Sequence, residues 1–270
     1  AGGVTTVVTG PGSANPIGGQ MAAVKTYGKR IDKMIVKAPL AIKMALGENP
    51  KRVYHDKSRT PVTRMATAAL IREQLYKAKN YMEKLDRAQK GEGTPPEFDF
   101  KCEALLPALR REIQVHIHCH RADDIFTAIR IAKEFDLDYV IVHATEGYLI
   151  ADELKEEGAR LLSGPFLSDR SKPELRNLTP ACPGKLSGAG LPVAIITDHP
   201  VTPEQYLPAL AGLAVREGMD YDEALRAITI NPAKICGIDN RVGSLEAGKD
   251  ADFTVYRTIA EAATDNGEAK

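Results

Sequence analysis

Short apolar stretches alternate with helical patterns along most of the chain, and this alternation constrains the fold more than any other feature. Most stretches are continuous apolar runs bounded by Gly or Pro, as strands buried on both faces should be. The alternation predicts an α/β protein with βα units around a parallel sheet, and we expect the sheet to close. The predicted strands are Thr5–Val8, Met34–Met44, Gln114–His118, Tyr139–His143, Arg160–Ser163 and Val193–Thr197.

Capping and proline signals between these runs predict where helices begin. Thr60-Pro61 predicts a long helix that continues to about Leu85, with Pro at its first position. Other starts resemble capping boxes or place Pro early in a helix. They are Ser171-x-x-Glu174, Thr202-Pro203-x-Gln205, Asp220-x-x-Glu223 and Asn231-Pro232, and a further helix is predicted over Asp124–Glu134.

Composition and charge narrow the class of partner. Lys plus Arg and Asp plus Glu both total 36, so no net field attracts nucleic acid or an anionic membrane. No apolar run approaches the roughly 18 residues of a membrane span, and no signal peptide opens the chain, which predicts a cytoplasmic protein. The four cysteines are scattered, and we expect reduced thiols. A small-molecule substrate is the expected partner, and a homo-oligomer is left open.

The densest group of chemically active side chains lies where a predicted strand ends. His116, His118 and His120 occupy alternate positions and are three of only six histidines. Alternation places their side chains on one face of the strand. The loops after parallel barrel strands form the active-site mouth, so these imidazoles are placed to bind a metal or a substrate. The alternative is a polar strand end with solvated histidines.

Two further strand ends carry similar side chains. His143 ends an apolar run, and taken alone it is also explained as a packed rim residue. Asp198 follows another such run and could instead cap the next helix. Together, His118, His143 and Asp198 supply two nitrogens and a carboxylate to one mouth, which suits Zn²⁺ or a similar divalent ion. Such an ion lowers the pKa of bound water to about 7, as amide hydrolysis requires.

Several motifs carry a resemblance to a known family. They are Gly3-Val4-Thr5-Thr6-Val7, His118-Cys119-His120-Arg121, His143, Thr197-Asp198-His199-Pro200, Asn231-Pro232-Ala233 and Gly243-Ser244-Leu245-x-x-Gly248-Lys249-Asp250-Ala251-Asp252. Through them the chain resembles the amidohydrolase superfamily, in particular its imidazolonepropionase-like branch, over nearly its whole length. The resemblance implies a (β/α)8 barrel of the TIM type in residues 1–240. It also implies the remnant of a small β-sandwich in residues 241–270, with Ala251–Tyr256 as a strand.

The resemblance also implies roles for residues at matching positions. His118 and His143 would be metal ligands, and Asp198 would be both a ligand and the general base. Members with two metal ions bridge them with a carbamylated Lys or a Glu. Lys43 is the first candidate for that bridge and Glu48 the second, and a solvated strand-end Lys is the alternative for Lys43.

Substrate contacts are implied for His120, Arg121 and His199. The loop over residues 164–172 adds Arg170 as a cation that could hold a carboxylate, although a solvated rim loop explains it equally well. The first hypothesis is a metal-dependent hydrolase that cleaves a cyclic amide or another amide C–N bond with metal-activated water. The second is a metallo-dipeptidase or deacetylase of the same superfamily.

The chain departs from the family pattern at its beginning. The family's first strand ends in a His-x-His pair that binds the more buried metal, and no such pair precedes Val4. His116 and His118 have that spacing but lie in the context of the fifth strand. We therefore expect an incomplete barrel without its first strand, with two exposed sheet edges. A third hypothesis follows, an inactive barrel fragment that serves as a binding or structural piece.

Overall fold

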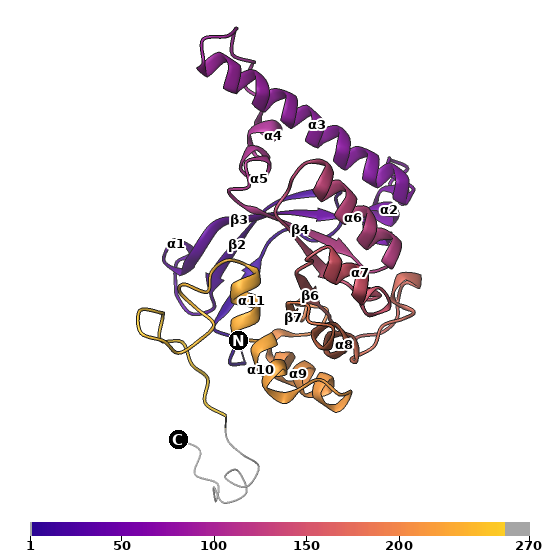
Figure 1. The fold of residues 1–270 in the computed structure, drawn as a ribbon, viewed down its shortest axis with the longest axis vertical. Helices are drawn as coiled ribbons and strands as arrows, with labels where there is room; N and C mark the ends of the chain where they lie inside the picture. Colours follow the sequence, from indigo (N-terminus) through magenta and orange to yellow (C-terminus); the bar gives the residue numbers. More distant parts are fainter. Residues whose placement is uncertain (1, 257–270) are drawn as a thin grey trace, which may run out of the picture.

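The computed structural model describes residues 2–256, and a curled sheet of seven strands lies at its centre (Figure 1). The strands lie side by side in chain order. β1 pairs antiparallel with β2 and β2 with β3, whereas β3 to β7 are parallel. The bounds are β1 Thr6–Thr9, β2 Ile17–Lys25, β3 Ile35–Ala45, β4 Gln114–Cys119, β5 Tyr139–His143, β6 Leu161–Ser163 and β7 Val193–Ile195.

Helices connect the parallel strands and cover the outer face of the sheet. The largest core cluster joins outer-face residues such as Ile117 and Ile141 to α3, α6, α7 and α8. A smaller cluster on the inner face joins Val140 and Val142 to Ile235 of α11. The helices are α1 Ile31–Met34, α2 Glu48–His55, α3 Arg64–Gln89, α4 Phe100–Glu103, α5 Leu106–Leu109, α6 Ala122–Glu134, α7 Ala151–Glu156, α8 Cys182–Gly188, α9 Leu207–Arg216, α10 Tyr221–Ala227 and α11 Ile230–Ile235. Short 3-10 turns are η1 Gly147–Leu149, η2 Pro173–Leu175 and η3 Glu204–Tyr206.

The parallel half of the sheet confirms the predicted βα units, and its open edges agree with the expected incomplete barrel and not with a closed sheet. Within residues 2–256, β1 and β7 each have one strand neighbour, so the sheet is open at both edges. The sequence analysis did not predict β2, because Gly18 and Gly19 interrupt its apolar pattern. The strand is also irregular, with register shifts against β3 at three places. The fold is therefore consistent with an incomplete barrel carrying an antiparallel hairpin at one edge.

The helix starts show where local signals succeed. Asp220 caps α10 as predicted, because its carboxylate accepts a hydrogen bond from the backbone N–H of Glu223 at 3.0 Å. The long helix α3 begins later than predicted, with Thr63 as its N-cap and not at Thr60-Pro61. The expected capping boxes at Ser171 and Thr202 are wrong, since both segments form 3-10 turns without a side-chain cap.

The predicted C-terminal strand is also absent. Residues 251–256 have no regular secondary structure, and residues 257–270 of the predicted β-sandwich segment lie outside the described residues. The segment is nevertheless attached to the sheet, because Lys25 of β2 forms ion pairs with Asp250, at 2.7 Å, and with Asp252. The β-sandwich segment in residues 241–270 therefore stays a prediction.

Two further predictions concern the state of the cysteines and the presence of membrane-spanning helices. All four cysteines are buried and free, so the expectation of reduced thiols is confirmed. Among the described residues, every helix is too short or too polar to cross a membrane.

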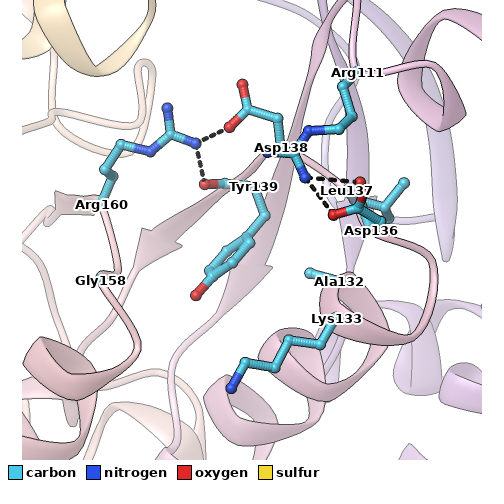
Figure 2. A pocket seen from close by; sticks show the side chains of 9 residues that line it. All are labelled: Arg111, Ala132, Lys133, Asp136, Leu137, Asp138, Tyr139, Gly158 and Arg160. Carbon is cyan, nitrogen blue, oxygen red and sulfur yellow. Dashed lines mark hydrogen bonds and ion pairs between the residues drawn. The ribbon is translucent and has the colours of Figure 1, made fainter.

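Ion pairs fasten the amino ends of the parallel strands. Arg160 pairs with Asp138 and donates to the carbonyl oxygen of Tyr139 at 2.8 Å. Arg111 donates to the carbonyl oxygen of Asp136 at 3.1 Å and pairs with its carboxylate. Figure 2 shows these groups around a shallow pocket of about 260 Å³, with the arginines turned toward their carboxylates.

Candidate metal centre

Three histidines meet at the carboxyl ends of β4 and β5. One ring nitrogen each of His118, His120 and His143 lies within 4.8 Å of the other two. The ring centroids are 4.4 Å apart for His118 and His143, 4.5 Å for His120 and His143, and 4.8 Å for His118 and His120. All three side chains are buried, so the centre is a cluster of imidazoles enclosed by protein.

Backbone geometry brings His143 into this cluster. In a regular strand His143 would share the face of Ile141, which packs on the outer helices. His143 instead has a φ of 78°, and Ala144 after it a φ of 47°. This left-handed turn ends the strand alternation and places the ring beside His118, whose strand partner Val142 faces inward.

The hydrogen bonding of His143 leaves one ring nitrogen available to bind a metal ion. Its Nδ1 lies 2.7 Å from the carbonyl oxygen of Gly164, which can only accept, so Nδ1 carries the proton. Nε2 therefore holds a lone pair, and this buried atom has no hydrogen-bond partner among the described residues. A histidine whose second nitrogen donates to a carbonyl is the usual arrangement of a metal ligand.

Two loop residues and one residue of α2 contact the other two rings. His118 Nδ1 lies 2.9 Å from the hydroxyl of Ser13, and its Nε2 lies 3.4 Å from the amide of Asn49. His120 Nδ1 lies 2.7 Å from the hydroxyl of Thr145. The rings are thus fixed by segments from three separate parts of the chain.

Burial keeps the three imidazoles neutral. Desolvation lowers the pKa of His143 to about 3 and moves the pKa values of His118 and His120 well below the ordinary value. The positive charges of Lys43 and Lys172 lower all three further. Neutral imidazole is the form that binds a metal, so the donor set fits a divalent ion.

Lys43 and Asp198 lie near the cluster without joining its ring nitrogens. Lys43 is buried, which lowers its pKa, and the charge of Asp198 opposes that change. Asp198 reaches solvent in the loop after β7, with a φ of 50°. Surrounding protein raises the pKa of its carboxyl, while Lys43 and Lys172 act in the opposite direction. The two predicted residues therefore share one electrostatic neighbourhood, and their roles stay predictions.

The remaining predicted residues each have a hydrogen-bond partner other than the three histidines, and their roles stay predictions. Arg121 forms two hydrogen bonds of 3.0 Å with Asp123, and the exposed Arg170 donates to the carbonyl oxygen of Leu178 at 2.8 Å. The exposed His199 accepts at Nδ1 from a backbone N–H at 3.3 Å.

Glu48 is the second candidate for a metal bridge, and its carboxylate already forms two ion pairs. Its carboxylate pairs with Arg64 at 2.9 Å and with Lys51 at 3.1 Å. Burial raises its pKa, but the hydrogen bonds and charges of Lys51 and Arg64 outweigh burial and lower it. It lies outside the three-histidine group.

Sequence reasoning missed several residues at the centre. Ser13 and Asn49 contact His118, and Lys172 and Glu174 lie beside His120. The sequence pointed to two of these positions, Lys172 in the loop over residues 164–172 and Glu174 in the Ser171-x-x-Glu174 pattern. The local interpretation of that pattern as a helix cap hid the long-range contacts of Glu174.

Neutral imidazoles at the carboxyl ends of parallel strands define a class of protein suited to hold a catalytic metal. The model of the amidohydrolase family matches residues 2–269, and the chain belongs to that family.

Similar proteins extend well beyond this chain. An amidohydrolase from Thermotoga maritima has a structure that superposes with a TM-score of 0.90 at 47% identity, covering 93% of this chain and 66% of that one. The amidohydrolase tasK of Hapsidospora irregularis is 31% identical over 95% of this chain and 28% of its own length. An imidazolonepropionase of Cupriavidus necator is 29% identical over 62% of this chain and 42% of its own length. The chain thus spans less than two thirds of each.

Proposed function

We propose that the protein is a metal-dependent hydrolase that cleaves a cyclic amide or another amide C–N bond of a small molecule. The observation that carries the proposal is the buried, unpartnered Nε2 of His143 beside two more neutral imidazoles. An apolar packing role would leave no reason to bury a lone pair without a partner. Membership of the amidohydrolase family supports the same chemistry.

His118 and His143 would hold the ion, with Asp198 as a third ligand from the loop after β7. Zn²⁺ suits this set, and when bound it supplies Lewis acidity toward both water and a carbonyl. Asp198 would take a proton from water at its carboxylate and pass it to the leaving nitrogen. Its raised pKa makes that carboxylate a better base than one with the ordinary pKa.

Lys43 would serve where a second ion is bound. Burial favours its neutral amine, which can add carbon dioxide and release a proton to become a carbamate. That anion would be a further oxygen ligand for metal ions near Asp198. His120 would contact the substrate, with Arg121, His199 and Arg170 contributing only after their present partners are exchanged.

Metal analysis tests the proposal. The purified chain, supplied with zinc and then dialysed, is compared with His143→Ala and with the control His55→Ala, which removes an exposed histidine. We expect about one zinc per chain in the wild type and the control, and a loss in His143→Ala. Zinc absent from the wild type, or retained in His143→Ala, would overturn the site.

A further inference from the structure

Glu174 is a buried carboxylate beside the histidine centre that no role described so far uses. It lies in the turn η2 and its side chain is 0% exposed. One oxygen, Oε2, accepts a hydrogen bond of 2.9 Å from the backbone N–H of Glu48 and lies 3.6 Å from the guanidinium of Arg64. The carboxylate therefore joins the loop after β6 to the start of α2.

The second oxygen faces the active-site side. Oε1 lies 3.0 Å from the ammonium of Lys172 and 3.7 Å from Nε2 of His120. These are ion-pair distances, and neither contact has the geometry of a hydrogen bond. Lys172 in turn donates to the side-chain oxygen of Asn49 at 2.9 Å. The negative oxygen is thus held in place and directed at the His120 ring.

The backbone is fitted closely around this carboxylate. Gly47 has a φ of 81°, and a Cβ there would lie 2.7 Å from Oε2 of Glu174 and 3.2 Å from Asp124. Asp124 is buried as well and accepts from Arg64 at 3.0 Å, but among the described residues it forms no hydrogen bond or ion pair with His120 or Lys172. Two buried acids therefore share one arginine, and only one of them faces the histidines.

The position of Oε1 decides between the two neutral forms of His120. With the proton on Nδ1, the ring would donate to Thr145 and turn the lone pair of Nε2 toward a carboxylate, which is repulsive. With the proton on Nε2, the positive N–H faces the carboxylate and the Thr145 hydroxyl donates to Nδ1. The second form satisfies both neighbours.

We propose that Glu174 is a positioning residue that keeps the proton of His120 on Nε2, so that this nitrogen carries an N–H facing Glu174 and His120 is withheld from the metal. Nδ1 of His120 is occupied by Thr145 and its Nε2 has no free lone pair. The ion is then left to the unpartnered Nε2 of His143 and to Nε2 of His118, which would exchange its long contact of 3.4 Å with the Asn49 amide for the ion. This inference rests on the proposed function for its meaning, but the tautomer exists with or without a metal.

Nitrogen NMR of histidine-labelled protein tests the inference, with His120→Gln to assign the signal. In the wild type without metal we expect the pattern of an Nε2-protonated ring. An Nδ1-protonated ring would overturn the proposal. This outcome is measured on the wild type and does not depend on the folding of a variant. On zinc addition we expect the nitrogen signals of His118 and His143 to shift strongly and those of His120 to shift little. A His120 shift as large as theirs would also overturn it.

Glu174→Gln gives the sharper comparison. Its amide oxygen must accept from the N–H of Glu48, which turns the NH₂ group toward His120, and we expect the proton to move to Nδ1. The matched control is Asp124→Asn, which disturbs the same arginine while leaving the His120 tautomer unchanged. A switch in both variants, or in neither, would show that Glu174 does not set the tautomer. Failure of zinc binding with an Nε2-protonated His120 would reject the proposed function alone.

Discussion

The two ends of the same parallel strands are built differently. At the carboxyl ends of β4 and β5, uncharged rings are packed together and Nε2 of His143 lacks a partner. At the amino ends, Arg111 and Arg160 are paired with Asp136 and Asp138 around a solvent-facing pocket (Figure 2). The difference indicates that one end is arranged for chemistry and the other for holding strands and loops in place.

His116 shows that the surroundings of a buried histidine change within two residues along β4. It shares the inner face of β4 with His118, two residues away, and burial lowers its pKa to about 3. Its Nε2 lies 3.0 Å from the side-chain oxygen of Gln114, whose amide donates to the carbonyl oxygen of Ile235 at 2.8 Å. His116, two residues before His118, is therefore linked through Gln114 to the backbone of α11.

The largest expected effect is on catalysis at the carboxyl end. Asp198→Asn removes the proposed base, and we expect the turnover of any amide that the wild type hydrolyses to fall by about 10²–10⁴-fold. Because the side chain reaches solvent, the melting temperature should stay unchanged. Activity assays with saturating zinc and a thermal melt check both statements. Undiminished turnover would place the base elsewhere.

Gly164→Ala should disturb the support of the centre. Gly164 has a φ of 125°, and a Cβ there would lie 2.4 Å from the carbonyl oxygen of Ile196. We expect a loss of about 2 to 3 kcal/mol in unfolding free energy and roughly tenfold weaker zinc binding, because its carbonyl orients His143. The control Gly12→Ala meets nothing within 4 Å. Urea denaturation and zinc titration should separate the two variants; equal stabilities would contradict the strain argument.

Breaking an ion pair at the amino end should have a smaller, purely structural effect. Asp138→Ala leaves Arg160 without its carboxylate, and both side chains are about one-third exposed. We expect a loss of about 0.5 to 1 kcal/mol in unfolding free energy, and less at high salt. Zinc content should not change. A variant that lost its metal would erase the distinction between the two ends.

The smallest effect concerns an exposed pair on the outer helices. The hydrogen bond from Lys77 lowers the pKa of Asp99 to about 2. A depressed carboxyl pKa contributes stability above the unfolded value near 3.8, and that contribution is lost as the pH falls through about 2. Lys77→Met should therefore raise the pKa of Asp99 toward 3.8. An NMR titration of the carboxyl carbon measures it, and an unmoved pKa would assign the shift to the backbone N–H donors at the helix start.

The sequence predicted what depends on local pattern and missed what depends on distant partners. Apolar runs that end in His118 and His143 identify parallel strands and place both rings at one edge. Glu174 was mistaken for a cap because its partner Glu48 lies 126 residues away. The inward turn of His143 depends on its φ of 78°, which the apolar run before it does not specify.

The burial of every native thiol has a practical consequence. Desolvation raises the pKa of Cys182 to about 11 and of Cys236 to about 12, and it also raises those of Cys102 and Cys119. Maleimides react with the thiolate and hardly with the protonated thiol. We therefore expect the four native cysteines to be nearly unreactive toward maleimides. A single cysteine introduced at an exposed position would then accept a fluorophore or spin label selectively, without removal of any native cysteine.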